Sequence, residues 1–190
     1  MTAADCLSPL DDDALIAYWL GELGEAAEAR IDEHVLGCDA CSGRLAQVVA
    51  LADGIRAAFA KGVVRAFVTP SFVRRAIEAG MRVREYRIPH NGSVNCSVAP
   101  DDQLLVAHLE APLANVTRID AQSYLDDAPV HVFRDVPFDA ASGELVLVPK
   151  LADVRTMPSH RQRVRLVAVD AAGERVLGDY TFNHAAGGPA

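Results

Sequence analysis

Three residues in the N-terminal third of the chain have types and spacing that suit a metal ion. They are His34, Cys38 and Cys41, which form a His-x3-Cys-x2-Cys motif. Neutral imidazole and thiolate are ligands that tetrahedral zinc prefers, and a structural zinc site uses four of them. Cys6 is the only other cysteine in the N-terminal half, so it is the candidate for the fourth ligand. The sequence therefore predicts one zinc ion held by Cys6, His34, Cys38 and Cys41.

A helix over about residues 24–36 would position this motif, because His34 and Cys38 are then four residues apart on one face. Gly37 is predicted to end that helix in a left-handed cap, and Asp39 to cap the next helix. The two cysteines would then lie on either side of a tight turn, so that one ion holds three helices together. The alternative is an exposed histidine beside cysteines that are buried as small apolar residues.

The charge of the chain is unevenly distributed. The formal net charge is −8, and residues 1–45 account for it with ten acidic and two basic side chains. Residues 54–87 instead carry eight basic side chains and two acidic ones. Two explanations stay open: solvated helix faces, or a bipolar surface that matches a partner with both basic and acidic faces.

The N-terminus lacks the basic region and the apolar core of a secretory signal. The longest apolar stretch, about 48–68, is interrupted by four charged residues and has the pattern of an amphipathic helix rather than of a membrane span. We therefore expect a cytoplasmic protein with no membrane partner, under reducing conditions. Cys96, in a predicted strand, is interpreted as a buried small residue.

The first 80 residues have the apolar period of helices. The first helix is predicted to begin at Ser8-Pro9, and the third and longest at about residue 40. Apolar positions expected to face inward on the third helix are Leu45, Val48, Val49, Ala52, Ile55 and Phe59. A short fourth helix is predicted to open at Thr69-Pro70 and to end at Gly80. Its expected inward positions are Phe72, Val73, Ala76 and Ile77.

Beyond residue 82 the apolar period changes to two, which is typical of strands. About seven short strands are predicted, among them 82–88, 103–110, 130–133, 144–148, 164–170 and 175–182, and the last two form a hairpin. The fold class is therefore α+β, with a zinc-bound three- to four-helix bundle before an antiparallel β-sandwich that is immunoglobulin-like or barrel-like. The expected divisions are a zinc-binding domain at 1–60, a basic linker with the fourth helix at 61–82, the β-sandwich at 83–184 and a flexible tail at 185–190.

The second half offers no catalytic motif. It has no Gly-rich phosphate loop, no Gly-x-Ser-x-Gly elbow and no His-Glu-x-x-His sequence. Its histidines, which lie at no spacing that would pair them as ligands, are His90, His108, His131, His160 and His184. We therefore expect no catalytic residues and no enzyme activity.

Three stretches of the chain resemble the zinc-containing domain of bacterial anti-sigma factors. They are Leu10–Tyr18, Gly21–Leu23 and Ile31–Cys41, and the resemblance covers roughly the first 60 residues. In that family a cysteine or histidine near the N-terminus completes the metal set, and Cys6 occupies the matching place. The resemblance implies a helical domain that grips an extracytoplasmic-function type sigma factor, occludes its polymerase-binding surface and represses transcription initiation.

This implied partner matches the charge pattern, because a sigma factor presents a basic DNA-reading surface and an acidic polymerase-binding surface. Expected contact residues on the fourth helix are Phe72, Arg74, Arg75 and Ile77. No direct nucleic-acid binding is expected. The β domain is interpreted as a sensor or interaction domain, and its edge strand could form a homodimer.

Other functions stay open at this point. One is a zinc-stabilised interaction module whose partner is not a sigma factor, and a weaker one makes the β domain an enzyme or a carbohydrate-type binding domain. In some members of the family, oxidation of the thiolate ligands releases zinc and the sigma factor. Redox switching through Cys38 and Cys41 is therefore a hypothesis beside a purely structural zinc.

Overall fold

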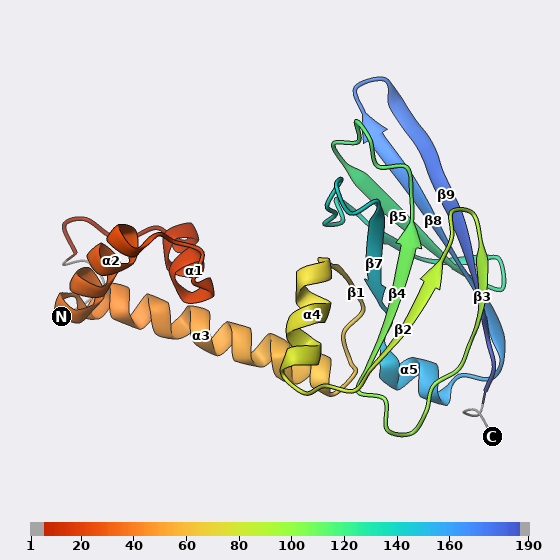
Figure 1. Cartoon of the computed structure of the whole chain (residues 1–190), viewed down its shortest axis with the longest axis horizontal. Coiled ribbons are helices and arrows are strands. Elements are labelled where there is room, and N and C mark those ends of the chain that lie inside the picture. Colours follow the sequence, from red (N-terminus) through yellow and green to blue (C-terminus); the bar gives the residue numbers. More distant parts are fainter. Residues whose placement is uncertain (1–5, 187–190) are drawn as a thin grey trace. The chain divides into compact units, whose positions relative to one another are not determined.

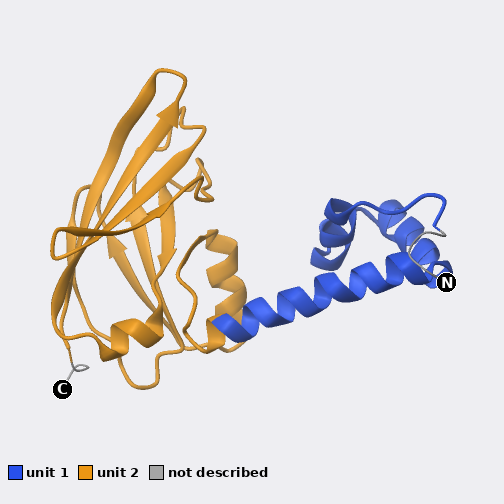
Figure 2. Cartoon of the chain, turned by 180° about the vertical axis from the view of Figure 1, so that it is seen from behind, with its two compact units in different colours: residues 1–58 blue, residues 59–190 orange. Residues whose placement is uncertain are grey.

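The computed structural model describes residues 6–186 of the chain, which folds into two compact units (Figure 2). Unit 1 comprises residues 1–58 and unit 2 comprises residues 59–190. Residues 61–82, predicted as a separate linker, fall within unit 2. Most of the predicted flexible tail lies outside the described residues.

Unit 1 is helical (Figure 1). Its helices are α1 (Asp12–Leu20), α2 (Glu25–Gly37) and α3 (Asp39–Ala60), the last of which ends in unit 2. The predicted start of the first helix at Ser8-Pro9 is wrong. A carboxylate oxygen of Asp11 accepts the Ala14 N–H at 2.6 Å and caps α1 there, while the guanidinium of Arg44 donates to the Leu10 carbonyl.

Both short helices of unit 1 pack on one side of α3 (Figure 1). Leu15 of α1 is fully buried, and the Arg56 guanidinium lies 4.7 Å from the centre of the Trp19 ring. The predicted inward position Ile55 is wrong, because 48% of this residue is exposed, as is 66% of Leu51. These two residues are four apart and share the face of α3 that the short helices leave uncovered.

No single helix in residues 6–186 is long and apolar enough to cross a membrane. The helices α2 and α3 meet that test only as a pair, with a bend of 113° between them.

Unit 2 contains two sheets and two further helices. The strands are β1 (Ala66–Val68), β2 (Val83–Ile88), β3 (Ser93–Cys96), β4 (Leu104–Glu110), β5 (Ile119–Leu125), β6 (Ala128–Phe133), β7 (Glu144–Val148), β8 (His160–Asp170) and β9 (Gly173–His184). The helices are α4 (Pro70–Glu78) and α5 (Leu151–Thr156). One sheet has the order β1-β7-β4-β2 and the other β3-β9-β8-β5-β6. The predicted α+β class and the β8–β9 hairpin are confirmed.

The predicted purely antiparallel arrangement is wrong, because both sheets are mixed. Strands β2 and β4 pair in parallel, and so do β3 and β9. The reason lies in the crossing of the chain between sheets. Strand β3 leaves the first sheet to join the second, and β4 then returns to lie beside β2 in the same direction.

The main core of unit 2 lies between the sheets and includes the fully buried Leu109, Leu166 and Tyr180. A second cluster lies between α4 and the outer face of the first sheet and includes Val73 and Val106. In the same cluster the ring centroids of Phe72 and Phe59 are 4.7 Å apart. Strands β4 and β7 are therefore covered on both faces, which explains their continuous apolar runs. The predicted inward position Ile77 is wrong, because 48% of it is exposed.

Tyr180 makes the stability of unit 2 sensitive to alkaline pH. Its hydroxyl donates to the Glu110 carbonyl at 2.5 Å, and burial raises the pKa of Tyr180 to about 12. Between pH 10 and 12 the unfolded chain loses a proton that the folded state keeps, so the free energy of unfolding falls as pH rises. We expect urea unfolding at a series of pH values to show this fall in the wild type and a smaller one in Tyr180→Phe. Parallel curves for the two proteins would contradict the assignment.

Candidate metal centre

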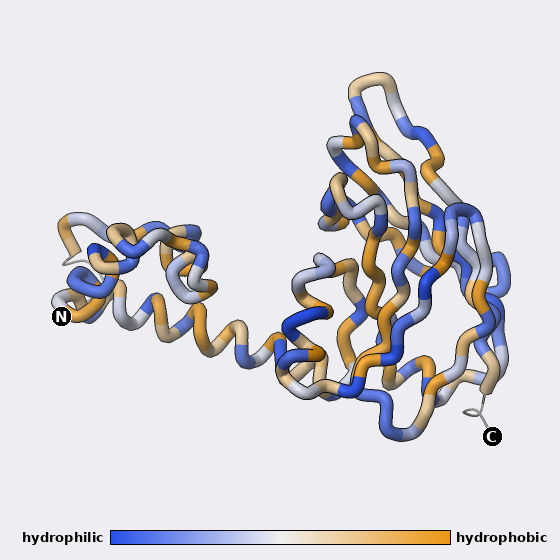
Figure 3. The backbone as a smooth tube through the Cα atoms, viewed as in Figure 1, coloured by the Kyte–Doolittle hydropathy of each residue, from blue (hydrophilic) through white to orange (hydrophobic). Residues whose placement is uncertain are grey.

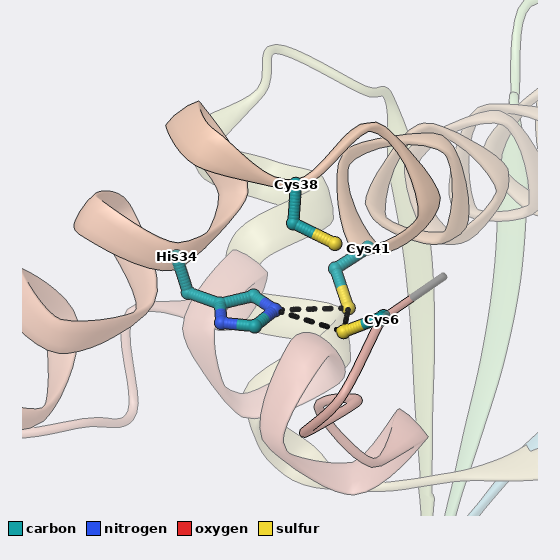
Figure 4. Close-up of side chains that lie close together, drawn as sticks. All are labelled: Cys6, His34, Cys38 and Cys41. Carbon is teal, nitrogen blue, oxygen red and sulfur yellow. Dashed lines mark hydrogen bonds between the residues drawn. The ribbon is translucent and has the colours of Figure 1, made fainter. Parts of the chain in front are cut away.

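Four side chains converge in unit 1 (Figure 4). Cys6 comes from the segment before α1, His34 from the last turn of α2, Cys38 from the break between helices and Cys41 from the first turn of α3. Their ligand atoms all lie within 4.8 Å of one another. The structure thus brings together all four residues that the sequence proposed as ligands.

The distances between these atoms suit a tetrahedral zinc ion. The Cys6 and Cys41 sulfurs are 3.9 Å apart, and His34 Nε2 lies 3.5 Å from Cys6 Sγ and 3.3 Å from Cys41 Sγ. Zinc bonds of about 2.3 Å to sulfur and about 2.0 Å to nitrogen give tetrahedral edges of about 3.8 Å between sulfurs and about 3.5 Å between nitrogen and sulfur. Cys6, His34 and Cys41 therefore need little movement to hold the ion, and Cys38 Sγ lies within 4.8 Å of their ligand atoms.

The turn that places the two motif cysteines is made by Cys38 itself. Its backbone is extended, with φ −131° and ψ 100°, and its carbonyl accepts the Ser42 N–H at 3.0 Å to begin α3. The predicted left-handed cap at Gly37 is wrong, because Gly37 is the last residue of α2 and does not have positive φ. A single extended residue is enough to reverse the chain here, so no left-handed glycine is needed.

The first turn of α3 favours a thiolate at Cys38. The backbone N–H of Cys41 faces the Cys38 sulfur and is the largest cause that lowers the pKa of this thiol below its usual value. The Cys6 pKa is raised, first by burial and further by the neighbouring Cys38 and Cys41 thiols. A bound Zn²⁺ would supply the positive charge that favours the thiolate form of its cysteine ligands.

The donor set leaves no ligand position open for substrate. One imidazole and three thiolates complete a tetrahedral zinc shell, which is typical of structural rather than catalytic zinc. In the described part of the chain, no other group of three histidine, cysteine or acidic side chains could share an ion.

The residues predicted to contact a partner all lie on α4 in unit 2. Arg74, Arg75 and Ile77 are exposed, whereas Phe72 is half-buried against Phe59. Neither arginine forms an ion pair with a residue of the described range 6–186. Three of the four residues are therefore accessible to a partner.

Comparison with known families bears on the same segment. Residues 12–42 match the family described as "Putative zinc-finger", the domain found in anti-sigma factors. The matched residues of the zinc-finger domain include His34, Cys38 and Cys41. Cys6 lies before the match, and the structure adds it to the ligand set.

No curated protein matches the chain. Among solved structures, the chain is similar to the "N-terminal domain of phage TP901-1 ORF48", with 12% identity over 56% of this chain and 98% of that chain and a TM-score of 0.37.

Proposed function

We propose that this protein is an anti-sigma factor. Its zinc-finger domain would bind an extracytoplasmic-function type sigma factor and keep it from RNA polymerase, without enzyme activity and without binding DNA itself. The observation that carries the proposal is the coincidence of the zinc-finger match at residues 12–42 with a complete four-residue metal cluster. In this reading the β unit serves as a sensor or interaction domain.

The exposed face of α3 supports a protein partner. Leu51 and Ile55 are 66% and 48% exposed, on a helix along which apolar residues recur (Figure 3). Large apolar side chains that share one exposed helix face are typical of a docking surface. A partner helix laid along this face would remove both side chains from water.

Charge supports the same partner class. On α1 and α2 the exposed acidic residues include Asp13, Glu25 and Glu33, which suits the basic DNA-reading surface of a sigma factor. The exposed Arg74 and Arg75 on α4 suit its acidic polymerase-binding surface.

An affinity experiment tests the proposal. Tagged full-length protein is incubated with its native extract under reducing conditions, and the bound proteins are identified by mass spectrometry. A Cys38→Ser/Cys41→Ser variant is treated in parallel. We expect the wild type to recover a single sigma factor and the variant to recover none. A zinc-loaded wild type that recovers another protein and no sigma factor would favour an interaction module with a non-sigma partner.

Arg74 and Arg75 provide a second prediction. The double change Arg74→Glu/Arg75→Glu should weaken sigma binding about ten-fold at low salt and less at high salt, because exposed charges act through a screened field. Titration calorimetry with the recovered sigma factor at two salt concentrations measures this. A control is Arg134→Glu/Arg175→Glu, which makes the same charge change elsewhere in unit 2 and also removes the ion pair between Arg134 and Asp120. If both double variants lost the same affinity for the sigma factor, the affinity would depend on net charge alone and not on Arg74 and Arg75.

Four protein ligands would leave a zinc ion without an open coordination position, and this supports a structural role for the ion in this proposal. Peroxide tests the alternative of a redox switch, since two zinc thiolates and one peroxide would give a disulfide, two hydroxide ions and free zinc. We expect zinc and sigma binding to persist at peroxide doses that oxidise exposed thiols. Release of both together would assign the site a sensing role.

A further inference from the structure

A narrow cavity opens at one end of unit 2, between the two sheets and beside α5. Leu105 and Ala107 of β4 line one wall, and Phe182 of β9 lines the other. The cavity leaves about 440 Å³ free of protein atoms, its open mouth included, but the centres of water-sized molecules reach only about 30 Å³ of it. It is therefore a thin, mostly apolar slot.

Five side chains with oxygen, nitrogen or sulfur atoms line this slot: Tyr86, Cys96, His160, Gln162 and His184. Cys96, His184 and His160 are direct partners across the neighbouring strands β3, β9 and β8. The two imidazole rings are 5.0 Å apart between centroids. These residues are far apart in the sequence, so only strand pairing assembles them.

The ring of His184 has a buried nitrogen that lacks a hydrogen-bond partner in the described part of the chain. Only 7% of the residue is exposed, and its Nδ1 has no hydrogen-bond partner in residues 6–186. The backbone of Val154 faces the ring and favours a proton on the other nitrogen. Burial, and then the nearby His160, lower the pKa of His184, so the ring is neutral and Nδ1 is an acceptor. An unpaired buried acceptor is costly unless something donates to it.

The ring of His160 also has one nitrogen that acts as a hydrogen-bond acceptor. Its Nδ1 lies 2.9 Å from the Pro158 carbonyl, so this nitrogen carries the proton and donates, which leaves Nε2 as an acceptor. Burial raises the pKa of Cys96, so its thiol stays protonated and adds an apolar wall rather than a charge. The slot thus combines apolar walls with imidazole acceptors and has no fixed charge.

We propose that this slot binds a small, flat, apolar molecule with one hydrogen-bond donor, such as a phenol, whose hydroxyl donates to His184 Nδ1. The proposal concerns unit 2 alone and does not rest on the proposed sigma partner.

Phenol and toluene test the proposal, because they have nearly the same shape and only phenol has a donor. Each is titrated into the full-length, isotope-labelled protein while NMR follows the methyl groups of Leu105 and Leu147 and the ring nitrogens of His184. We expect phenol to shift these signals with at least about ten-fold higher affinity than toluene.

Two variants separate recognition from folding. His184→Phe removes the acceptor, and we expect it to abolish the preference for phenol over toluene. His131→Phe, on the exposed strand β6, makes the same change away from the slot and should leave the preference intact. The proposal is overturned if phenol and toluene bind the wild type alike, if neither binds up to the solubility of toluene, or if the shifts lie outside the slot.

Discussion

Replacing Cys41 by serine is expected to remove zinc from the protein and to unfold unit 1 while unit 2 stays folded. In the described part of unit 1, only Leu15, Ile31 and Cys41 are buried apolar residues. A domain of about 60 residues with so small a core has little stability of its own. Structural zinc contributes about 10–16 kcal/mol of binding free energy in zinc-finger peptides. A zinc ion bound at the cluster would therefore be the main source of stability for unit 1.

Zinc content by mass spectrometry and helix content by circular dichroism measure this effect. We expect Cys41→Ser, and wild type treated with a strong chelator, to lose the zinc and the helical signal of unit 1 together. Cys96→Ser is the matched control, because Cys96 is the one cysteine outside the cluster and lies in unit 2. A Cys41→Ser protein that keeps its full helical signal without zinc would show that packing alone folds unit 1.

A double change on α3, Leu51→Gln/Ile55→Gln, is expected to reduce sigma binding by about 100-fold or more. Burial of one large aliphatic side chain contributes about 1.5–3 kcal/mol, and both of these residues are available to a partner. Glutamine is a good helix former and carries no charge, so the helix and the net charge are preserved. The loss of affinity for the sigma factor would then measure the apolar contact alone.

The affinity of the purified variant for the sigma factor, measured by calorimetry, decides this prediction. Zinc content and melting temperature should stay at wild-type values, because neither residue belongs to the core of unit 1. Val130→Gln/Val176→Gln makes a similar change at exposed positions of unit 2 and serves as the control. Binding within about three-fold of wild type for the α3 variant would exclude this face as the docking surface.

The metal cluster could be predicted from the sequence because its geometry is mostly local. His34, Cys38 and Cys41 lie within eight residues, and the helical repeat on one side of Cys38 and the turn at Cys38 bring them together. Cys6 followed from the need for a fourth ligand. The turn itself was predicted wrongly at Gly37, since an extended Cys38 reverses the chain without a left-handed residue.

Strands were predicted correctly where the alternating pattern is long, and were missed where the strand is too short to show one. The β8–β9 hairpin was found because its strands are long and adjacent in the sequence. Strand β1 has only three residues, too few to show a clear period, and it was not predicted. The inward face of α3 was overestimated at Ile55, because periodicity reveals an apolar face but not whether another helix covers it.

By itself, the sequence determined which four residues form the candidate metal cluster, the α+β class and the acidic and basic segments, because each depends on residue type and mostly on short spacing. Only the tertiary structure decided the strand order, the two parallel pairs and the slot at His160 and His184. It also decided that α4 covers the first sheet while Leu51 and Ile55 stay exposed. These features depend on contacts between segments far apart in the chain, and local periodicity does not encode which apolar surfaces meet.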